Sequence, residues 1–393
     1  MDIFAKCSSF TVAKEAIAAG YYPYFIPLAE NEGSEAVCRG RRLIMCGSNN
    51  YLGLTTHPKV RQAALDAIRR YGTSCTGSRF LNGTLELHEQ LERELAKWLG
   101  KESALVFSTG MQTNLGTISA LVSREDVVVL DKQDHASIVD GARLGWGETK
   151  RFRHNDMTDL TRVLKSIPEG KGKLVVVDGV YSMQGDIAPL SEMVPICKEY
   201  GTRLMVDDAH AMGVLGGGRG TAAHFDMTGG VDLIMSTFSK SFASLGGFIA
   251  GDEPVVHYIK HHGRALIYSA SIPPANAAAA LAALHVMQEE PERVARVNEI
   301  AARMRQEYRR LGFDIGQSET PVIPIIIGDD MRTLLTWKAL FEAGVFVNPV
   351  LSPAVPEGRQ LLRTSYMATH TDEQLDNVLE IFAQVGRQTG LIS

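Results

Sequence analysis

The stretch LIMSTFSKSFASLGGFIA, Leu233–Ala250, decides the fold. A short apolar run, Leu233–Met235, leads into the polar segment Ser236–Lys240, and a second apolar run, Gly247–Ala250, follows a pair of glycines. This pattern predicts two strands with a lysine directly after the first. Ligands of open α/β sheets bind beyond the carboxyl ends of the strands. Lys240 is therefore placed where chemistry is expected.

Comparable apolar runs precede this stretch, and helical segments separate most of them. They are Ala104–Phe107, Val127–Leu130, Leu174–Val177 and Leu204–Val206. Continuous apolar strands that alternate with helices indicate a mostly parallel sheet covered on both faces. The predicted fold class is therefore α/β.

The pattern changes after Pro274, where a long helical region rich in Ala, Glu and Arg extends to about Arg310. Strands and helices then alternate up to a final helix from Asp372, which indicates a smaller α+β domain. We divide the chain into an N-terminal segment (1–45), a large domain (46–280) and a C-terminal small domain (281–393).

The composition is that of an ordinary globular protein, with 393 residues, 45% hydrophobic and 22% charged. A net charge of −5 without long runs of like charge argues against nucleic acid as a partner. Five scattered cysteines without a CxxC pair indicate free thiols, so no residue is assigned to a metal. The N-terminus lacks the pattern of a signal peptide, and no apolar stretch is long enough to span a bilayer. We expect a cytoplasmic protein without a transmembrane segment.

Polar groups follow three of the predicted strands. Asp207 and His210 follow one strand, Lys240 follows another, and Asp131–His135 follows a third. A lysine forms an imine with an aldehyde, and a carboxylate keeps a pyridine nitrogen protonated, so this set suits pyridoxal 5′-phosphate (PLP). Each signal alone has a plainer interpretation, because such a lysine is usually solvated and such an aspartate usually caps a helix. The glycine-rich segment 213–220 lacks the strand–turn–helix context of a dinucleotide site, which argues against that fold.

The order of these residues resembles the fold-type I PLP enzymes and, more narrowly, the α-oxoamine synthases. The resemblance covers nearly the whole chain, in the blocks SNNYLGL (48–54), GSRFLNGTLELHEQLE (77–92), FSTGMQTNLG (107–116), DHASIVDG (134–141), GVYSMQGDIAPL (179–190), VDDAHAMGVLG (206–216), TFSKSFASLGGF (237–248), YSASIPP (268–274) and LLRTSYMATHT (361–371). Enzymes of this family condense an amino acid with an acyl-CoA and release CoA and CO2.

The resemblance implies a catalytic role for four residues. Lys240 would hold PLP as a Schiff base and later accept the proton from the substrate α-carbon. Asp207 would pair with the pyridine nitrogen, and His210 would hydrogen-bond the ring oxygen. His135 would stack on the ring face opposite Lys240 and lie near the substrate carboxylate.

The resemblance also implies binding residues. Cofactor contacts would come from Gly110, Met111, Ser182, Thr237, Ser239, Ser269 and Ala270, the last two from the neighbouring subunit of a homodimer with shared active sites. Arg363 and Asn50 would bind the substrate carboxylate. The alternative interpretation of Ser182, Asn50 and Ser269 is structural: each would lie in a loop or cap a helix, with its hydrogen bonds made within the fold.

Several stretches are similar to the bacterial serine palmitoyltransferase branch of the family: YYPYFIPL (21–28), YGTSCTGSRFLNGTLELH (71–88), FRHNDM (152–157), TFSKSFASLGGF (237–248) and VFVNPVLSPAVPEG (345–358). That branch condenses L-serine with a long-chain acyl-CoA, commonly palmitoyl-CoA, at the first step of sphingolipid synthesis. The alternatives within the family are 2-amino-3-ketobutyrate CoA ligase and 8-amino-7-oxononanoate synthase. Outside it stand an aminotransferase of the same fold and a non-catalytic PLP-fold binding protein, which would not need Lys240.

Overall fold

Seven strands form the large sheet of the computed structural model, which describes residues 2–393. In spatial order they are β4 (Ser103–Phe107), β10 (Gly247–Gly251), β9 (Leu233–Thr237), β8 (Arg203–Asp207), β7 (Lys173–Asp178), β5 (Val127–Asp131) and β6 (Glu148–Phe152). Strands β5 to β9 are parallel, whereas β10 is antiparallel to both β9 and β4. The predicted α/β class with a mostly parallel sheet is confirmed.

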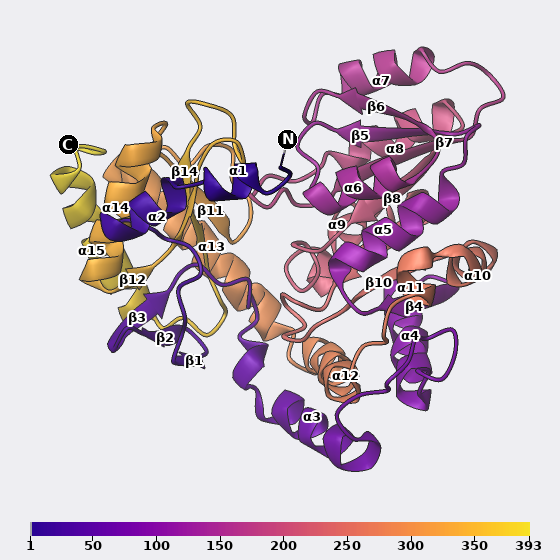
Figure 1. The fold of residues 1–393 in the computed structure, drawn as a ribbon, viewed down its shortest axis with the longest axis horizontal. Coiled ribbons are helices and arrows are strands. Elements are labelled where there is room, and N and C mark those ends of the chain that lie inside the picture. The colour runs from indigo at the N-terminus through magenta and orange to yellow at the C-terminus, as the bar shows by residue number, and fades with distance from the viewer. Residues whose placement is uncertain (1) are drawn as a thin grey trace.

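Helices cover both faces of this sheet (Figure 1). The helices of this lobe are α3 (Pro58–Tyr71), which packs on α12 and not on the sheet, α4 (Glu86–Leu99), α5 (Gly110–Leu121), α6 (Ala136–Leu144), α7 (Met157–Lys165), α8 (Leu190–Glu199), α9 (Thr221–His224), α10 (Glu253–His262), α11 (Arg264–Ile267) and α12 (Pro274–Glu289). Alternate residues of β7 enter two separate cores: Val175 and Val177 pack into one, and Leu174 and Val176 into the other. This explains why the strand sequences are apolar at consecutive positions.

A second lobe contains two small sheets. The first is antiparallel, in the order β11 (Val322–Ile326), β14 (Leu361–Ser365) and β13 (Asn348–Val350). The second is β1 (Glu30–Glu32), β2 (Glu35–Cys38), β3 (Arg41–Met45) and β12 (Val345–Phe346), so N-terminal strands pair with a C-terminal one. Helices α13 (Glu292–Leu311), α14 (Asp330–Ala343) and α15 (Asp372–Gln388) pack on this lobe, and α1 (Ala5–Ser8) and α2 (Val12–Ala18) lie beside it (Figure 1). The domain limits at 45 and 280 stay predictions.

Two elements differ from the pattern expected. Strand β6 was not predicted, because its sequence ETKRF is mostly polar. It lies at the edge of the sheet and is largely exposed, so it needs few apolar residues. The long helical region is broken at Glu290, which leaves the helical conformation before Pro291. A proline disfavours helical geometry in the residue before it, so two helices form where one was expected.

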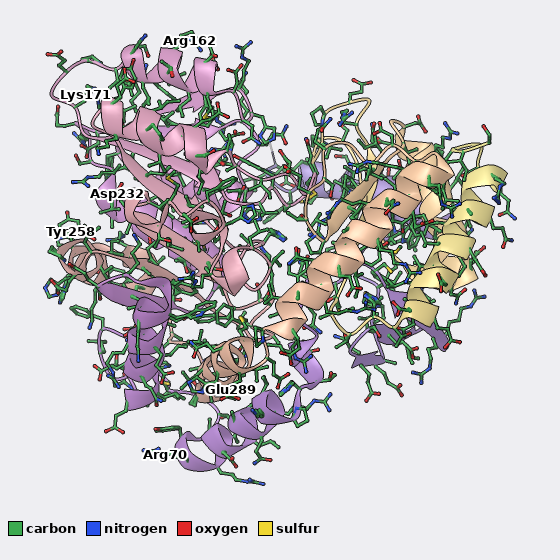
Figure 2. The ribbon with its side chains drawn as sticks, turned by 180° about the vertical axis from the view of Figure 1, so that it is seen from behind. Arg70, Arg162, Lys171, Asp232, Tyr258 and Glu289 are labelled. Atoms are coloured by element: carbon green, nitrogen blue, oxygen red, sulfur yellow. The ribbon has the colours of Figure 1, made fainter. Side chains whose placement is uncertain are left out.

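The outer surface carries charged side chains such as Arg70 and Arg162, which point away from the body (Figure 2). Within residues 2–393, no helix has the length and apolarity needed to cross a membrane.

Candidate active site

A pocket of about 250 Å³ opens at the carboxyl ends of β7, β8 and β9, beside the start of α5. This is the sheet edge at which ligands bind. Its lining includes most of the residues predicted for the site: Gly110, Met111, His135, Ser182, Asp207, His210, Thr237, Ser239 and Lys240.

Lys240 lies in the turn between β9 and β10. Phe238 stacks on Phe248 with ring centroids 5.5 Å apart, which ties this turn to the core while the lysine enters the pocket. Burial lowers the pKa of Lys240 to about 8, and the carboxylates of Asp207 and Asp178 offset that decrease only partly. About a tenth of the amine is therefore neutral and nucleophilic at pH 7, far more than for an ordinary lysine.

Asp207 ends β8 and is held by a chain of buried polar groups. The Asn114 side-chain amide donates to Asp207 Oδ2 over 2.7 Å and to Ser137 Oγ over 2.8 Å. Ser137 Oγ lies 2.7 Å from His135 Nδ1, and the Ala209 N–H donates to Asp207 Oδ1 over 3.0 Å. Because Asn114 and Ser137 are fully buried, this chain fixes the acid and the histidine relative to each other.

Two buried acids, Asp178 and Asp134, fix the backbone at His135. Its backbone N–H donates to Asp178 Oδ2 over 2.7 Å, and the Asp178 N–H donates to Asp134 Oδ1 over 3.1 Å. Burial raises the pKa of both acids well above the ordinary value, and the charges of neighbouring carboxylates raise it further. Burial lowers the pKa of His135, so its ring is neutral at neutral pH.

His210 contacts Tyr51, which links it to Arg363. The Tyr51 hydroxyl lies 2.7 Å from His210 Nδ1 and 3.4 Å from Arg363 Nη2. An arginine only donates, so the Tyr51 hydroxyl accepts from Arg363, while it also contacts His210 Nδ1 and donates to Asn49 Oδ1 over 3.4 Å. Burial lowers the pKa of His210 well below its usual value, and the charges of Lys240 and Arg363 lower it further. The His210 ring is therefore neutral.

Arg363 lies on β14 of the second lobe and is 5% exposed. Its Nε donates to the Ser182 carbonyl over 2.5 Å, and its Nη2 donates to Asn49 Oδ1 over 2.9 Å. These acceptors are neutral, so the buried guanidinium keeps a charge that suits a carboxylate ligand. Asn50 is also buried, and its amide donates to Thr55 Oγ1 over 2.8 Å while its Oδ1 has no partner.

The start of α5 supplies the anion-binding end of the pocket. The first amides of a helix have no partner within the helix, which leaves those of Gly110 and Met111 available to a phosphate. A Cβ on Gly110 would lie 2.9 Å from Thr237 Oγ1, so only glycine permits this close approach. Thr237 Oγ1 lies 2.9 Å from Ser239 Oγ, which completes a hydroxyl pair beside the helix start. This cradle and the low-pKa lysine fit PLP.

Ser269 and Ala270 lie outside the pocket lining, against the start of α5 in the same chain. Gln112 Nε2 donates to Ser269 Oγ over 2.5 Å, and the Ser108 hydroxyl donates to the Ala270 carbonyl. Their contact with the cofactor of a neighbouring subunit stays a prediction.

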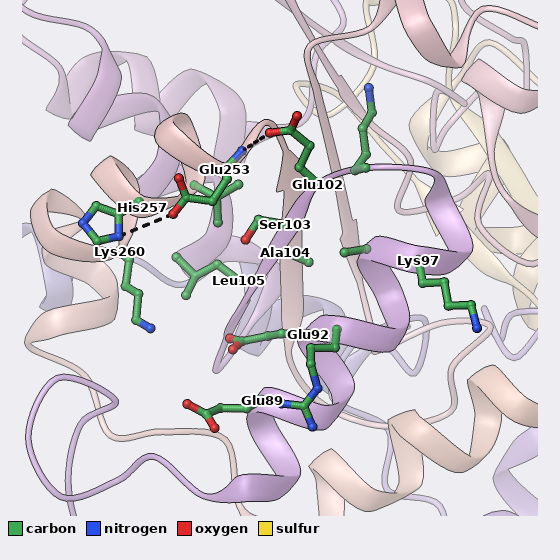
Figure 3. A pocket seen from close by; sticks show the side chains of 14 residues that line it. Glu89, Glu92, Lys97, Glu102, Ser103, Ala104, Leu105, Glu253, His257 and Lys260 are labelled. Atoms are coloured by element: carbon green, nitrogen blue, oxygen red, sulfur yellow. Dashed lines mark hydrogen bonds and ion pairs between the residues drawn. The ribbon is translucent and has the colours of Figure 1, made fainter.

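A larger hollow of about 500 Å³ lies between α4, β4 and α10 (Figure 3). Its charged side chains include Glu89, Lys97, Glu253 and Lys260, and the backbone N–H of Glu253 donates to Glu102 over 3.0 Å. None of the residues predicted for the site lines it. The chemistry therefore belongs to the smaller pocket.

Sequence reasoning missed several polar residues that hold the site together: Asn49, Tyr51, Asn114, Ser137 and Asp178. Four of them lie in sequence blocks that carry the family resemblance, but their individual roles are visible only in the folded chain. Asp178 follows Leu174–Val177, the strand whose end was not considered, so the same strand-end criterion points to it.

Comparisons with known proteins agree with this geometry. The model of the aminotransferase class I and II family matches residues 41–382. A serine palmitoyltransferase of Sphingobacterium spiritivorum is 48% identical over 389 residues, covering 99% of this chain and 98% of the relative. A solved serine palmitoyltransferase of Sphingomonas wittichii has a TM-score of 0.97 at 39% identity, with 100% of each chain covered. Another solved serine palmitoyltransferase, which contains PLP, has a TM-score of 0.97 at 36% identity, again with 100% of each chain covered.

Proposed function

Because the chain belongs to the aminotransferase class I and II family and, within it, to the α-oxoamine synthases, we propose that it catalyses the serine palmitoyltransferase reaction. L-Serine condenses with a long-chain acyl-CoA, such as palmitoyl-CoA, to 3-ketosphinganine, with release of CoA and CO2. The enzyme uses PLP. The observation that carries the proposal is one pocket that joins a buried low-pKa lysine and an oriented aspartate, with a buried arginine that lacks a carboxylate partner hydrogen-bonded to Ser182 of its lining.

PLP supplies an aldehyde for amines and a ring that draws electrons from the substrate α-carbon. Lys240 would hold PLP through its amine and would accept the substrate α-proton, for which a pKa near 8 is well matched. Asp207 keeps a proton on the pyridine nitrogen. His210 would hydrogen-bond the ring oxygen, and the neutral His135 would pack against the ring.

Arg363 binds the serine carboxylate as a two-pronged donor. The Ser182 carbonyl and Asn49 fix its guanidinium, and Tyr51 connects it to His210. A carboxylate held in this way anchors the amino acid in the ground state and in the transition state alike. Asn50, with an unpartnered buried oxygen, lies in the same segment as Asn49 and Tyr51.

An apolar cluster beside the Ser182 turn supports a long-chain acyl donor. Val350, Val355 and Leu361 pack together, and Met183 and Ile326 pack against them. This cluster includes part of the stretch 345–358 that resembles the serine palmitoyltransferase branch. An acyl chain extending from the pocket in this direction would remain in apolar surroundings.

We further propose a cytoplasmic homodimer in which Ser269 and Ala270 serve the neighbouring active site. Large apolar side chains are exposed near these residues, among them Phe80, Leu81 and Tyr268. Burial of such side chains against a second copy would stabilise a dimer.

CoA release by the holoenzyme tests the proposed reaction. L-Serine, glycine and L-alanine are each combined with palmitoyl-CoA and with acetyl-CoA, and the variant Lys240→Ala serves as the inactive control. We expect fast release only with L-serine and palmitoyl-CoA. Preference for glycine with acetyl-CoA would move the enzyme to the ketobutyrate branch, and L-alanine as the preferred amino acid would move it to the oxononanoate branch. Turnover by Lys240→Ala equal to the wild type would contradict the assignment of the lysine.

A further inference from the structure

A partly buried histidine, His154, lies between two carboxylates outside the lining of the pocket. His154 Nδ1 is 3.0 Å from Asp131 Oδ1, and its Nε2 is 2.7 Å from Asp186 Oδ2. Both ring nitrogens face carboxylate oxygens, so both donate and the ring is positively charged. The His154 side chain is 18% exposed and that of Asp131 is 0% exposed. The proposed reaction gives this ion triad no role.

The two carboxylates belong to different parts of the large lobe. Asp131 ends β5, and its oxygens also accept from the N–H groups of Gln133 and Asn155 over 2.8 and 2.9 Å. Asp186 lies in the hairpin 181–187, and it accepts from the Asn155 side-chain amide over 3.0 Å. His154 therefore connects the hairpin to the end of β5, the strand next to the edge of the sheet.

The hairpin is closed at its own ends. The Tyr181 N–H donates to the Asp186 carbonyl over 3.0 Å, and the Gly185 N–H donates to the Tyr181 carbonyl over 2.8 Å. The Tyr181 ring also meets the His154 ring edge-on, with centroids 4.4 Å apart. A displacement of Asp186 would therefore carry the whole hairpin with it.

The hairpin also packs directly against the second lobe. Gly185 has a φ of +70°, and a Cβ there would lie 2.0 Å from the Val322 carbonyl oxygen. The Gly185 carbonyl accepts from Thr320 Oγ1 over 3.0 Å. Between Tyr181 and Gly185, the Ser182 carbonyl accepts from Arg363 Nε. The position of the Arg363 side chain thus depends on the position of the hairpin.

We propose that His154 is a positioning residue for the amino-acid substrate: held between Asp131 and Asp186, it fixes the hairpin whose Ser182 carbonyl orients Arg363. This inference rests on the proposed function, in which Arg363 binds the substrate carboxylate. Weaker alignment of Arg363 weakens binding of the carboxylate alike in the ground state and in the transition state. Such uniform loss raises KM and leaves kcat nearly unchanged.

The test compares His154→Gln and Asp186→Asn with the wild-type holoenzyme. We expect the KM for L-serine to rise roughly tenfold, with kcat within about threefold and the KM for palmitoyl-CoA unchanged. Binding is also measured by absorbance titration with L-serine and with L-serine methyl ester, which lacks the carboxylate. Only the affinity for L-serine is expected to fall. Asp186→Asn keeps the side-chain shape and supplies the result if His154→Gln does not fold.

His285→Gln is the matched control, because His285 Nε2 pairs with Glu94 Oε2 at 2.5 Å on helices away from the pocket. Its kinetic constants should equal those of the wild type. An unchanged KM for L-serine in both test variants, or equal weakening of the acid and the ester, would overturn the proposal. If the wild type prefers glycine or L-alanine, the proposed substrate is wrong, and the same comparison with that amino acid still decides the role of His154.

Discussion

At the scale of the residue, the site is characterised by which of its side chains carry a proton. His135 and His210 are neutral, His154 is charged, and Lys240 has a pKa near 8. Burial pushes the first two histidines toward the neutral form, whereas two carboxylates hold the third in the charged form. Environment, not residue type, therefore separates the three histidines.

Asn114 is the residue on which the orientation of Asp207 depends. Replacement by leucine removes two hydrogen bonds and leaves the buried Asp207 Oδ2 without its donor. A hydrogen bond to a charged group contributes about 1.5–3 kcal/mol. We therefore expect kcat/KM to fall roughly 10- to 100-fold, measured by CoA release.

Asn298→Leu is the control for Asn114→Leu, because Asn298 also donates twice, to the Val214 and Val294 carbonyls, away from the pocket. It should lower the melting temperature without lowering kcat/KM. Equal kinetic losses in both variants would mean that Asn114 acts only through general stability.

The charge of His154 makes part of the stability dependent on pH. Burial lowers its pKa, but hydrogen bonds to Asp131 and Asp186 outweigh burial and raise it to about 9, against an ordinary value of 6.5. The folded state thus binds the extra proton more tightly, and the resulting stability is fully present below pH 6.5 and lost as pH rises toward 9. The difference in melting temperature between the wild type and His154→Gln should shrink over this window. A difference that stays constant from pH 6 to pH 9.5 would contradict a charged His154.

At the scale of the element, the loop 77–84 is fixed to helix α4 and to the edge strand β4 by one buried ion pair. Arg79 donates to both oxygens of Glu92, over 2.7 and 3.1 Å, and the Val106 N–H donates to Glu92 Oε1 over 2.8 Å. Removal of one partner leaves the other charge buried and unpaired.

Arg79→Met is therefore expected to lower the free energy of unfolding by about 3–5 kcal/mol, measured by urea denaturation. Arg69→Met is the matched control, because its partner Asp66 is exposed and the pair should contribute about 0–1 kcal/mol. Similar values for the two variants would mean that the Arg79 pair is not effectively buried in solution.

The sequence predicted the elements that carry long apolar runs and missed those that do not. Strands β5, β7, β8 and β9 were expected because both of their faces are buried, whereas β6 is polar and exposed on one edge. For the site, strand ends indicated Lys240, Asp207 and His210. Asn114 and His154 were not predicted because their roles come from contacts with residues far away in the sequence, which neither periodicity nor local spacing reveals.

At the scale of the whole molecule, the apolar surface beside the site has a testable consequence. Leu81 is 78% exposed and Tyr268 is 75% exposed, close to the segment that we propose to cross the dimer interface. Leu81→Asp should convert the dimer into monomers in light scattering and reduce activity at least tenfold, because a buried unpaired charge is costly. Leu335→Asp, at a site 51% exposed on α14, should remain dimeric and active. A wild-type monomer with full activity would contradict the shared site.

The division of the proposed binding residues between two lobes has one more consequence. Lys240 follows a strand of the large sheet, and Arg363 belongs to a strand of the other lobe. An amino acid held by both residues would be a removable cross-link between the two lobes. While the amino acid is bound, it would link the two lobes to each other. Loss of its carboxylate as CO2 would remove that link before the product leaves.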